Sequence, residues 1–143
     1  MRKSRPRPPV VKNAAYVLRE FRKSYADCLD PSMSDETFWR AAPVRRLTWK
    51  SDRRITLSEA VRCYGQMATN YNEFQPEMIG MLHKAFPDAG IQVTPAREYS
   101  VAVYLHVPNT PGLRQQVELF ATSHFLADEV WWDSDDTLRC WWD

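Results

Sequence analysis

Hydrophobic residues recur every three or four positions through much of the N-terminal half of the chain, as they do on one face of an α-helix. This spacing predicts long helices over residues 13–29, 57–71 and 76–86. A shorter helix is expected over residues 35–42, where Ser34 is placed to cap the first turn. The N-terminal half is therefore expected to be mainly helical.

Local signals mark where these helices begin and end. Thr56 and Glu59 have the spacing of a capping box, in which each side chain satisfies a backbone amide at the start of a helix. Asp30 ends the first helix, because a residue that precedes proline avoids helical geometry. Gly65 lies inside the hydrophobic pattern of residues 57–71. Glycine within a helix lowers its stability by about 1 kcal/mol relative to alanine, so its presence favours a close contact with another helix at this position.

From position 91 onward the hydrophobic period becomes two, which is typical of β-strands. One face of the strand over residues 99–107 is expected to carry Tyr99, Val101, Val103, Leu105 and Val107. The other face is expected to carry Ser100, Ala102, Tyr104 and His106. Residues 108–112 contain two prolines and a glycine, so we expect a loop there.

Two further segments have less regular patterns. Residues 44–56 alternate around Trp49 and are expected to form a strand or a hairpin that turns at Ser51 and Asp52. Residues 113–122 fit both a strand and a helix. We expect a strand, because the preceding loop is short enough to close a hairpin, and the helix is the alternative.

The last fifteen residues predict a hairpin that turns at Ser134 and Asp135. The expected register places Trp132 opposite Thr137 and Trp131 opposite Leu138. One face of the hairpin would then carry Trp131, Leu138, Cys140 and Trp142. The other face would carry Val130, Trp132, Arg139 and Trp141. Because both faces carry tryptophan, one is expected to pack on the helices and the other to be covered by another part of the chain or by a partner.

These elements predict an α+β domain in which N-terminal helices pack on one face of a mostly antiparallel C-terminal sheet. The chain has 143 residues, of which 44% are hydrophobic and 13% aromatic, and this size suits one globular domain over residues 13–143. Residues 1–12 hold five basic residues and three prolines without a hydrophobic period, so we expect a flexible basic arm.

Charge is distributed unevenly along the chain. Residues 1–64 carry 15 basic and 7 acidic side chains, a net charge of +8, and residues 65–143 carry 4 and 11, a net charge of −7. Such segregation indicates a basic partner surface, an acidic one, or two halves that neutralise each other on folding. All three alternatives stay open at this stage.

Basic residues in the first half are the first candidate site. Lysine and arginine release counterions from phosphates, and an aromatic ring among them can stack on a base. The candidate nucleic-acid-binding residues are Arg2, Lys3, Arg5, Arg7, Arg45, Arg46, Trp49, Lys50, Arg53 and Arg54. The alternative is a solvated charged hairpin in which Trp49 belongs to the core. A helix-turn-helix over residues 57–86 is disfavoured, since its second helix carries Lys84 as its only lysine or arginine.

The acidic, tryptophan-rich C-terminal hairpin is the second candidate site. Aromatic anchors ringed by charge are typical of protein interfaces. The candidate interface residues are Trp132, Asp133, Asp135, Asp136, Arg139 and Trp141. Acidic residues can also imitate phosphates toward a nucleic-acid-binding protein. A core hairpin with a polar turn and a homodimer contact are the simpler alternatives.

Catalytic patterns are sparse. The three histidines, His83, His106 and His124, lack the spacing of a helical metal pair. Cys28, Cys63 and Cys140 form no CxxC motif, and with an odd count and no export signal they are expected to be reduced. Cys28 and Cys63 fall on hydrophobic helical stripes and are expected to be structural. Four scattered glycines provide no phosphate-binding loop. We therefore expect no enzyme activity, no cofactor and no metal.

The sequence as a whole favours a small binding protein of the accessory-factor type. The leading hypothesis is that it engages nucleic acid or a nucleoprotein complex through the basic N-terminal half. The alternative is a protein-binding or inhibitor module that uses the C-terminal hairpin. No apolar run approaches the roughly 18 residues of a membrane span, so we expect a cytoplasmic protein with no membrane partner.

Overall fold

The computed structural model describes residues 15–26, 48–67 and 73–143 of the chain. This part contains four helices and one six-stranded antiparallel sheet, which confirms the predicted α+β class. The helices are α1 (Ala15–Ser24), α4 (Leu57–Tyr64), α5 (Glu77–Ala85) and α6 (Leu113–His124). The strands are β1 (Thr48–Lys50), β2 (Ile55–Thr56), β3 (Gln92–Glu98), β4 (Ser100–His106), β5 (Glu129–Ser134) and β6 (Thr137–Trp141). The helix expected over residues 35–42 lies outside the described residues.

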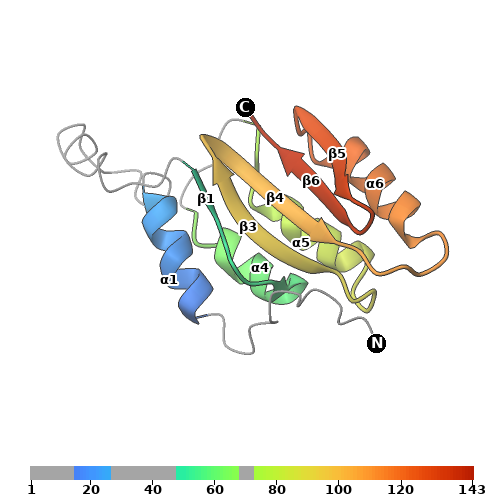
Figure 1. The fold of residues 1–143 in the computed structure, drawn as a ribbon, viewed down its shortest axis with the longest axis horizontal. Coiled ribbons are helices and arrows are strands. Elements are labelled where there is room, and N and C mark those ends of the chain that lie inside the picture. Colours follow the sequence, from blue (N-terminus) through green and yellow to red (C-terminus); the bar gives the residue numbers. More distant parts are fainter. Residues whose placement is uncertain (1–14, 27–47, 68–72) are drawn as a thin grey trace, which may run out of the picture.

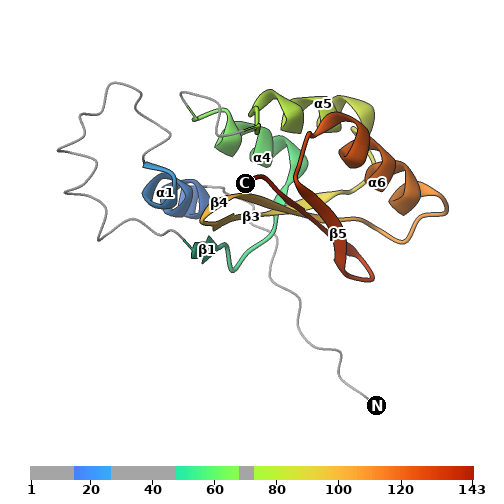
Figure 2. The same ribbon diagram turned by 90° about the horizontal axis from the view of Figure 1, so that it is seen from above.

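The sheet has the strand order β1-β3-β4-β6-β5, and β2 also pairs with β3 (Figure 1). Helices α4, α5 and α6 lie on one face, while α1 lies beside the β1 edge (Figure 2). The opposite face carries no helix from the described part of the chain. An antiparallel sheet tolerates such one-sided cover because its strands alternate apolar and polar side chains. Within this opposite face, Ala96, Ala102 and Tyr104 are buried, and Trp141 packs against them.

One hydrophobic core fills the space between the helices and the sheet. Val17, Phe21 and Tyr25 of the first helical segment are fully buried, as their spacing predicted. The ring of Phe21 meets that of Tyr64 edge-on, with 5.2 Å between centroids. The Tyr25 hydroxyl donates a hydrogen bond to the backbone carbonyl of Ala96 on β3. These contacts attach α1 to both α4 and the sheet.

The Thr56 N-cap of the predicted capping box is confirmed at the start of α4, whereas the Glu59 carboxylate contacts the Thr56 hydroxyl and not the Thr56 amide. The Thr56 hydroxyl accepts a hydrogen bond from the Glu59 amide at 3.2 Å and lies 3.3 Å from the Glu59 carboxylate. The helix is shorter than expected, because it ends at Tyr64 with Gly65 as its C-cap. A Cβ at Gly65 would lie nearest the carbonyls of Val61 and Arg62, so the expected helix–helix contact at Gly65 is wrong.

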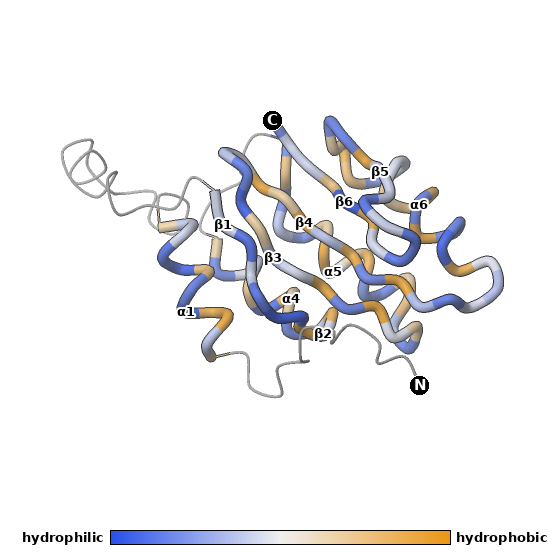
Figure 3. Tube along the Cα trace, viewed as in Figure 1, coloured by the Kyte–Doolittle hydropathy of each residue, from blue (hydrophilic) through white to orange (hydrophobic). Residues whose placement is uncertain are grey.

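The alternation predicted for β4 is confirmed at every position from Ser100 to His106. Val101, Val103 and Leu105 belong to the core between sheet and helices, and Ala102 and Tyr104 pack on the opposite face. Hydropathy along the trace shows the contrast between apolar β4 and the hydrophilic β5–β6 turn (Figure 3). Tyr99 is the exception. It forms the turn between β3 and β4 with a φ of 63° and is 70% exposed, so its expected inward placement is wrong.

Residues 113–122 belong to helix α6, so the expected strand is wrong. Leu113, Val117 and Ala121 are buried, and their spacing of four places them on one helical face. The loop before α6 therefore leads into a helix that packs on the sheet instead of closing a hairpin. Strand β4 pairs with β6, which lies beyond the helix in sequence.

The segment 44–56 forms no hairpin of its own within the described residues. Strands β1 and β2 each pair antiparallel with β3 and not with each other. The turn predicted at Ser51 and Asp52 lies between them. Burial against the helices decides this pairing, since Ile55 at the end of the segment is fully buried.

The C-terminal hairpin is confirmed, but its register differs by one residue on β5. Trp132 pairs with Leu138 and Trp131 with Arg139, and an irregularity lies between Trp132 and Ser134. A bulge of this kind shifts every residue that precedes it to the other face. Trp132 therefore packs against the core, and Trp131 is 47% exposed on the open face. Trp132 was expected to share a face with Arg139 and Trp141, and it lies on the opposite face of the hairpin.

The observed register predicts an order of stability among three tryptophan variants. Trp142→Ala should lower the free energy of unfolding by about 3–5 kcal/mol, since Trp142 is fully buried between Phe74 and Phe125. Trp131→Ala should cost less than about 1 kcal/mol, because its ring is half exposed. Trp132→Ala should lie between them. Urea denaturation measures all three, and a larger loss for Trp131→Ala than for Trp132→Ala would contradict the register.

Candidate functional site

The basic residues singled out from the sequence do not form one surface in the described part of the chain. Trp49 is partly buried and packs against the core. The Lys50 ammonium lies 3.8 Å from the centroid of the Tyr104 ring, on the open sheet face. Arg53 lies over the ring of Tyr16, and Arg54 borders a cavity at the far end of the sheet. The remaining candidates, Arg2, Lys3, Arg5, Arg7, Arg45 and Arg46, lie outside the described residues.

The described residues are acidic as a group. They carry 11 lysines and arginines against 14 aspartates and glutamates, a net charge of −3. The basic excess of the sequence therefore belongs to the segments that the structure does not describe. The full chain has a net charge of +1, so its overall charge favours neither an anionic nor a cationic partner.

Two tryptophans and an arginine form a stacked group on the open sheet face. The guanidinium carbon of Arg139 lies 4.7 Å from the ring centroid of Trp131 and 5.8 Å from that of Trp141. The Trp141 indole nitrogen donates a hydrogen bond to the backbone carbonyl of Glu98 at 3.0 Å. We call Trp131, Arg139 and Trp141 the Trp–Arg–Trp group.

Two carboxylates hold Arg139 in this position. Its Nε donates to Glu98 Oε2 at 3.0 Å, and its Nη1 donates to Glu129 Oε2 at 2.9 Å. Its Nη2 also bonds to Glu98. Burial of Arg139 by itself lowers its pKa, but the hydrogen bonds and charges of Glu98 and Glu129 raise that pKa overall. The guanidinium is therefore fixed and permanently charged beside the Trp131 ring.

Glu98 joins this group to the centre of the sheet. The Tyr104 hydroxyl donates a hydrogen bond to Glu98 Oε1. Burial tends to raise the pKa of Glu98, but the hydrogen bonds from Arg139 and Tyr104 and the charge of Arg139 lower it overall. Burial and the hydrogen bond to Glu98 raise the pKa of Tyr104 to about 12. Tyr104 therefore stays a hydrogen-bond donor at neutral pH.

Acidic side chains surround the exposed end of the hairpin. Asp133 and Asp135 are exposed, as the sequence predicted, and Asp136 is partly buried. Burial tends to raise the pKa of Asp136, but hydrogen bonds from Thr137 and Ser134 and the charges of Arg54 and His106 lower it overall. Residues 128–143 contain six carboxylate side chains and Arg139 as their only lysine or arginine.

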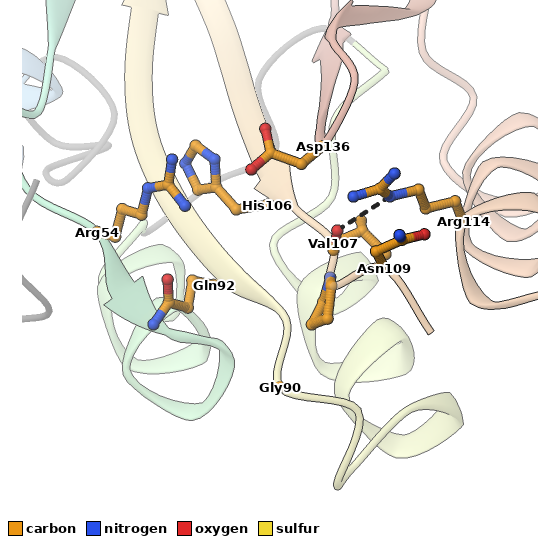
Figure 4. Close-up of a pocket in the computed structure, with 9 residues that line it drawn as sticks. Arg54, Gly90, Gln92, His106, Val107, Asn109, Arg114 and Asp136 are labelled. Carbon is orange, nitrogen blue, oxygen red and sulfur yellow. Dashed lines mark hydrogen bonds between the residues drawn. The ribbon is translucent and has the colours of Figure 1, made fainter. Parts of the chain in front are cut away.

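A polar cavity of about 180 Å³ lies at the other end of β3 and β4 (Figure 4). Its polar lining side chains are Arg54, Gln92, His106, Asn109, Arg114 and Asp136. The His106 ring is held from both sides, with Nε2 2.6 Å from the Thr94 hydroxyl and Nδ1 3.0 Å from the Thr137 hydroxyl. The lining residues come from four separate parts of the sequence, so no local sequence motif predicts the cavity.

The two described cysteines, Cys63 and Cys140, are buried free thiols of low reactivity. Burial raises the pKa of Cys63 and of Cys140 to about 12, so neither is a thiolate at neutral pH. This matches the structural role expected for Cys63, while Cys28 lies outside the described residues. Among residues 15–26, 48–67 and 73–143, no group of His, Cys, Asp and Glu side chains is arranged to hold a metal ion. No helix in the same ranges has the length and apolar character needed to span a membrane.

Sequence reasoning found part of this site. It singled out Arg139 and Trp141, which the structure brings together with Trp131, and it singled out the hairpin aspartates, of which Asp133 and Asp135 are exposed and Asp136 lines the cavity. It missed Glu98 and Tyr104, which orient Arg139, and it selected Trp132 in place of Trp131. The alternation of β4 did place Tyr104 on the polar face, so a search for acidic partners at the end of the preceding strand could have found Glu98.

Comparison with known proteins gives no assignment: no protein family, curated protein or solved structure matches the chain. The proposals below therefore depend on the geometry and charge of the site alone.

The Glu98 carboxylate predicts a pH dependence of stability. A carboxyl group whose pKa is lower in the folded state stabilises the fold above its unfolded pKa, and this stabilisation is lost as pH falls through the folded value. Glu98→Gln should lower the free energy of unfolding at pH 7 by about 1 kcal/mol and make it less dependent on pH below its ordinary pKa of 4.5.

Chemical denaturation between pH 3 and pH 7 measures this difference. Glu118→Gln on α6 is the matched control, because Glu118 has no ion pair with another described residue. Equal pH profiles for Glu98→Gln and the unmodified protein would contradict the assigned role of Glu98.

Proposed function

We propose that the protein is a non-enzymatic binding protein that engages a basic protein surface through its acidic, tryptophan-bearing β5–β6 hairpin. The observation that carries this proposal is Trp131, which is 47% exposed and stacked on a guanidinium that two carboxylates hold in place. Tryptophan and arginine are the residues most enriched where protein interfaces gain their binding energy. A side chain already held in one geometry loses little conformational entropy on binding.

The charge of the hairpin favours a cationic partner. Six carboxylate side chains lie within residues 128–143, and those of Asp133 and Asp135 are exposed on the same hairpin as the Trp–Arg–Trp group. A partner rich in arginine and lysine would pair with these carboxylates and offer guanidinium groups to the open face of Trp131. The nucleic-acid-binding surface of another protein has this chemistry. Occupation of such a surface would give the protein the role of an inhibitor or accessory factor.

Nucleic-acid binding through the basic N-terminal half stays a prediction. Its residues Arg2, Lys3, Arg5, Arg7, Arg45 and Arg46 lie outside the described part of the chain. In the described part, Trp49 packs against the core, and Lys50, Arg53 and Arg54 lie in different surroundings. The geometry therefore supports the hairpin as the better candidate for the main interaction.

A fluorescein-labelled nona-arginine peptide provides the direct test, with fluorescence anisotropy as the measurement. We expect saturable binding that Trp131→Ala weakens tenfold or more, since the stacking surface is lost. The pair Asp133→Asn and Asp135→Asn should weaken binding and reduce its dependence on salt. Leu119→Ala is the matched control, because Leu119 is 67% exposed on α6 and lies outside the hairpin.

Three outcomes would overturn this function. The first is peptide binding that Trp131→Ala leaves unchanged while the melting temperature is also unchanged. The second is a dimer in sedimentation that Trp131→Ala dissociates, since a second copy would then cover the face. The third is tighter binding of labelled DNA or RNA that is lost when Arg45, Arg46, Arg53 and Arg54 are replaced by alanine, which would support the N-terminal half instead.

A further inference from the structure

We propose that the cavity at the end of the sheet, bounded by Arg54, His106, Asn109 and Arg114, binds a terminal phosphate group. This site goes beyond the proposed function, because it uses none of the Trp–Arg–Trp group. His106 pairs with Thr137 and Ala102 pairs with Trp141, so the cavity and Trp141 are separated by four residues along the strands. At about 3.4 Å per residue, this separation is roughly 14 Å.

The lining is rich in hydrogen-bond donors that approach from different sides. Arg54 enters from the segment before β2, and Arg114 enters from the first turn of α6 (Figure 4). The amide side chains of Asn109 and Gln92 complete the lining together with His106. Guanidinium groups bind phosphate oxygens through paired, charge-assisted hydrogen bonds. Two of them at one small cavity are the main requirement of an anion site.

Arg114 is anchored in a way that leaves its terminal nitrogens for a ligand. Its Nε donates to the backbone carbonyl of Val107 at 3.3 Å. In the part of the chain that the structure describes, no carboxylate lies within ion-pairing distance of Arg114, and its two terminal nitrogens have no hydrogen-bond acceptor. The guanidinium is therefore positioned by the protein but not neutralised by it.

The carboxylate in the lining, Asp136, offsets part of the charge of Arg54. Asp136 accepts hydrogen bonds from the hydroxyls of Thr137 at 2.9 Å and Ser134 at 3.0 Å. Because a carboxylate only accepts, the Thr137 hydroxyl gives its hydrogen to Asp136 and accepts one from Nδ1 of His106. Asp136 thus orients the imidazole ring. The charged side chains of the lining are then Arg54, Arg114 and Asp136 when His106 is neutral.

The size of the cavity selects a terminal group. Complete small-molecule ligands occupy cavities of about 300–1,000 Å³, and the volume here is about 180 Å³. A phosphate group fits this space, while the remainder of a nucleotide or oligonucleotide would lie outside. The proposed ligand is therefore a phosphate monoester, and inorganic phosphate is the smallest probe that offers the same phosphate oxygens.

The test is an NMR titration of the full chain with inorganic phosphate, a nucleoside 5′-monophosphate and the matching nucleoside. We expect saturable shifts of the His106 ring and the Arg114 side-chain N–H with both phosphates and none with the nucleoside. Arg114→Gln should weaken phosphate binding tenfold or more, and Arg54→Gln should do the same if its melting temperature is unchanged. Arg62→Gln is the matched control, because Arg62 is an exposed arginine on α4 outside the cavity lining.

Further experiments distinguish the possible sources of the phosphate group and test phosphate binding separately from peptide binding by the hairpin. A 5′-phosphorylated oligonucleotide that binds more tightly than its 5′-hydroxyl form through Arg114 would identify a nucleic-acid end as the ligand. Trp131→Ala should leave phosphate binding intact, and Arg114→Gln should leave nona-arginine binding intact, so each proposal can fail alone. The phosphate site is overturned by unsaturable shifts, by equal losses in Arg114→Gln and Arg62→Gln, or by acetate binding as tightly as phosphate.

Discussion

The antiparallel pairing of β6 with β4 on one side and β5 on the other decides which side chains of this protein are buried and which face solvent. Because helices cover one face of the sheet, a residue on β6 belongs either to the core or to the open face. Leu138 and Cys140 lie on the covered face, and Arg139 between them lies on the open face. The bulge between Trp132 and Ser134 then places Trp131 beside Arg139. A one-residue change in this pairing would turn Trp131 toward the core and place Trp132 beside Arg139 instead.

Hydrogen bonds and ion pairs on the open face hold the side chain of Arg139 in one position. Arg139 bonds to Glu98 and Glu129, and Tyr104 bonds to Glu98, so residues from four strands hold one guanidinium. An isolated surface ion pair contributes little to stability, because ordering two long side chains costs entropy. In a network, a side chain that one partner already orders loses less conformational entropy when it forms a further ion pair. The consequence is that Trp131 presents its ring beside an ordered cation, with exposed carboxylates on the same hairpin.

Much of the fold could be predicted from the sequence, and the exceptions have physical causes. The N-cap at Thr56 and the alternation of β4 depend on contacts between neighbours in sequence, and both are confirmed. The hydrophobic residues of 113–122 fit both the period of a strand and that of a helix. Strand β4 pairs with β6, so residues 113–122 do not form the strand beside β4 and fold as a helix instead. The bulge on β5 has no local signal, so Trp132 was chosen in place of Trp131. The cavity could not be predicted, because Arg54, His106 and Arg114 meet only when the sheet and α6 have formed.

The fold redistributes the charge that the sequence segregates. Arg54, from the basic half, lies close enough to lower the pKa of Asp136 in the acidic half, so the two halves are partly neutralised at the cavity. Arg139 belongs to the acidic half and neutralises Glu98 and Glu129 within it. What remains is an acidic hairpin tip with Asp133 and Asp135 exposed, and a cationic group at Arg114 whose charge no described carboxylate pairs with. Arg114 and Asp135 line one surface pocket, so the acidic tip and the cationic group meet at this end of the hairpin, and each weakens the attraction of the other for a charged ligand.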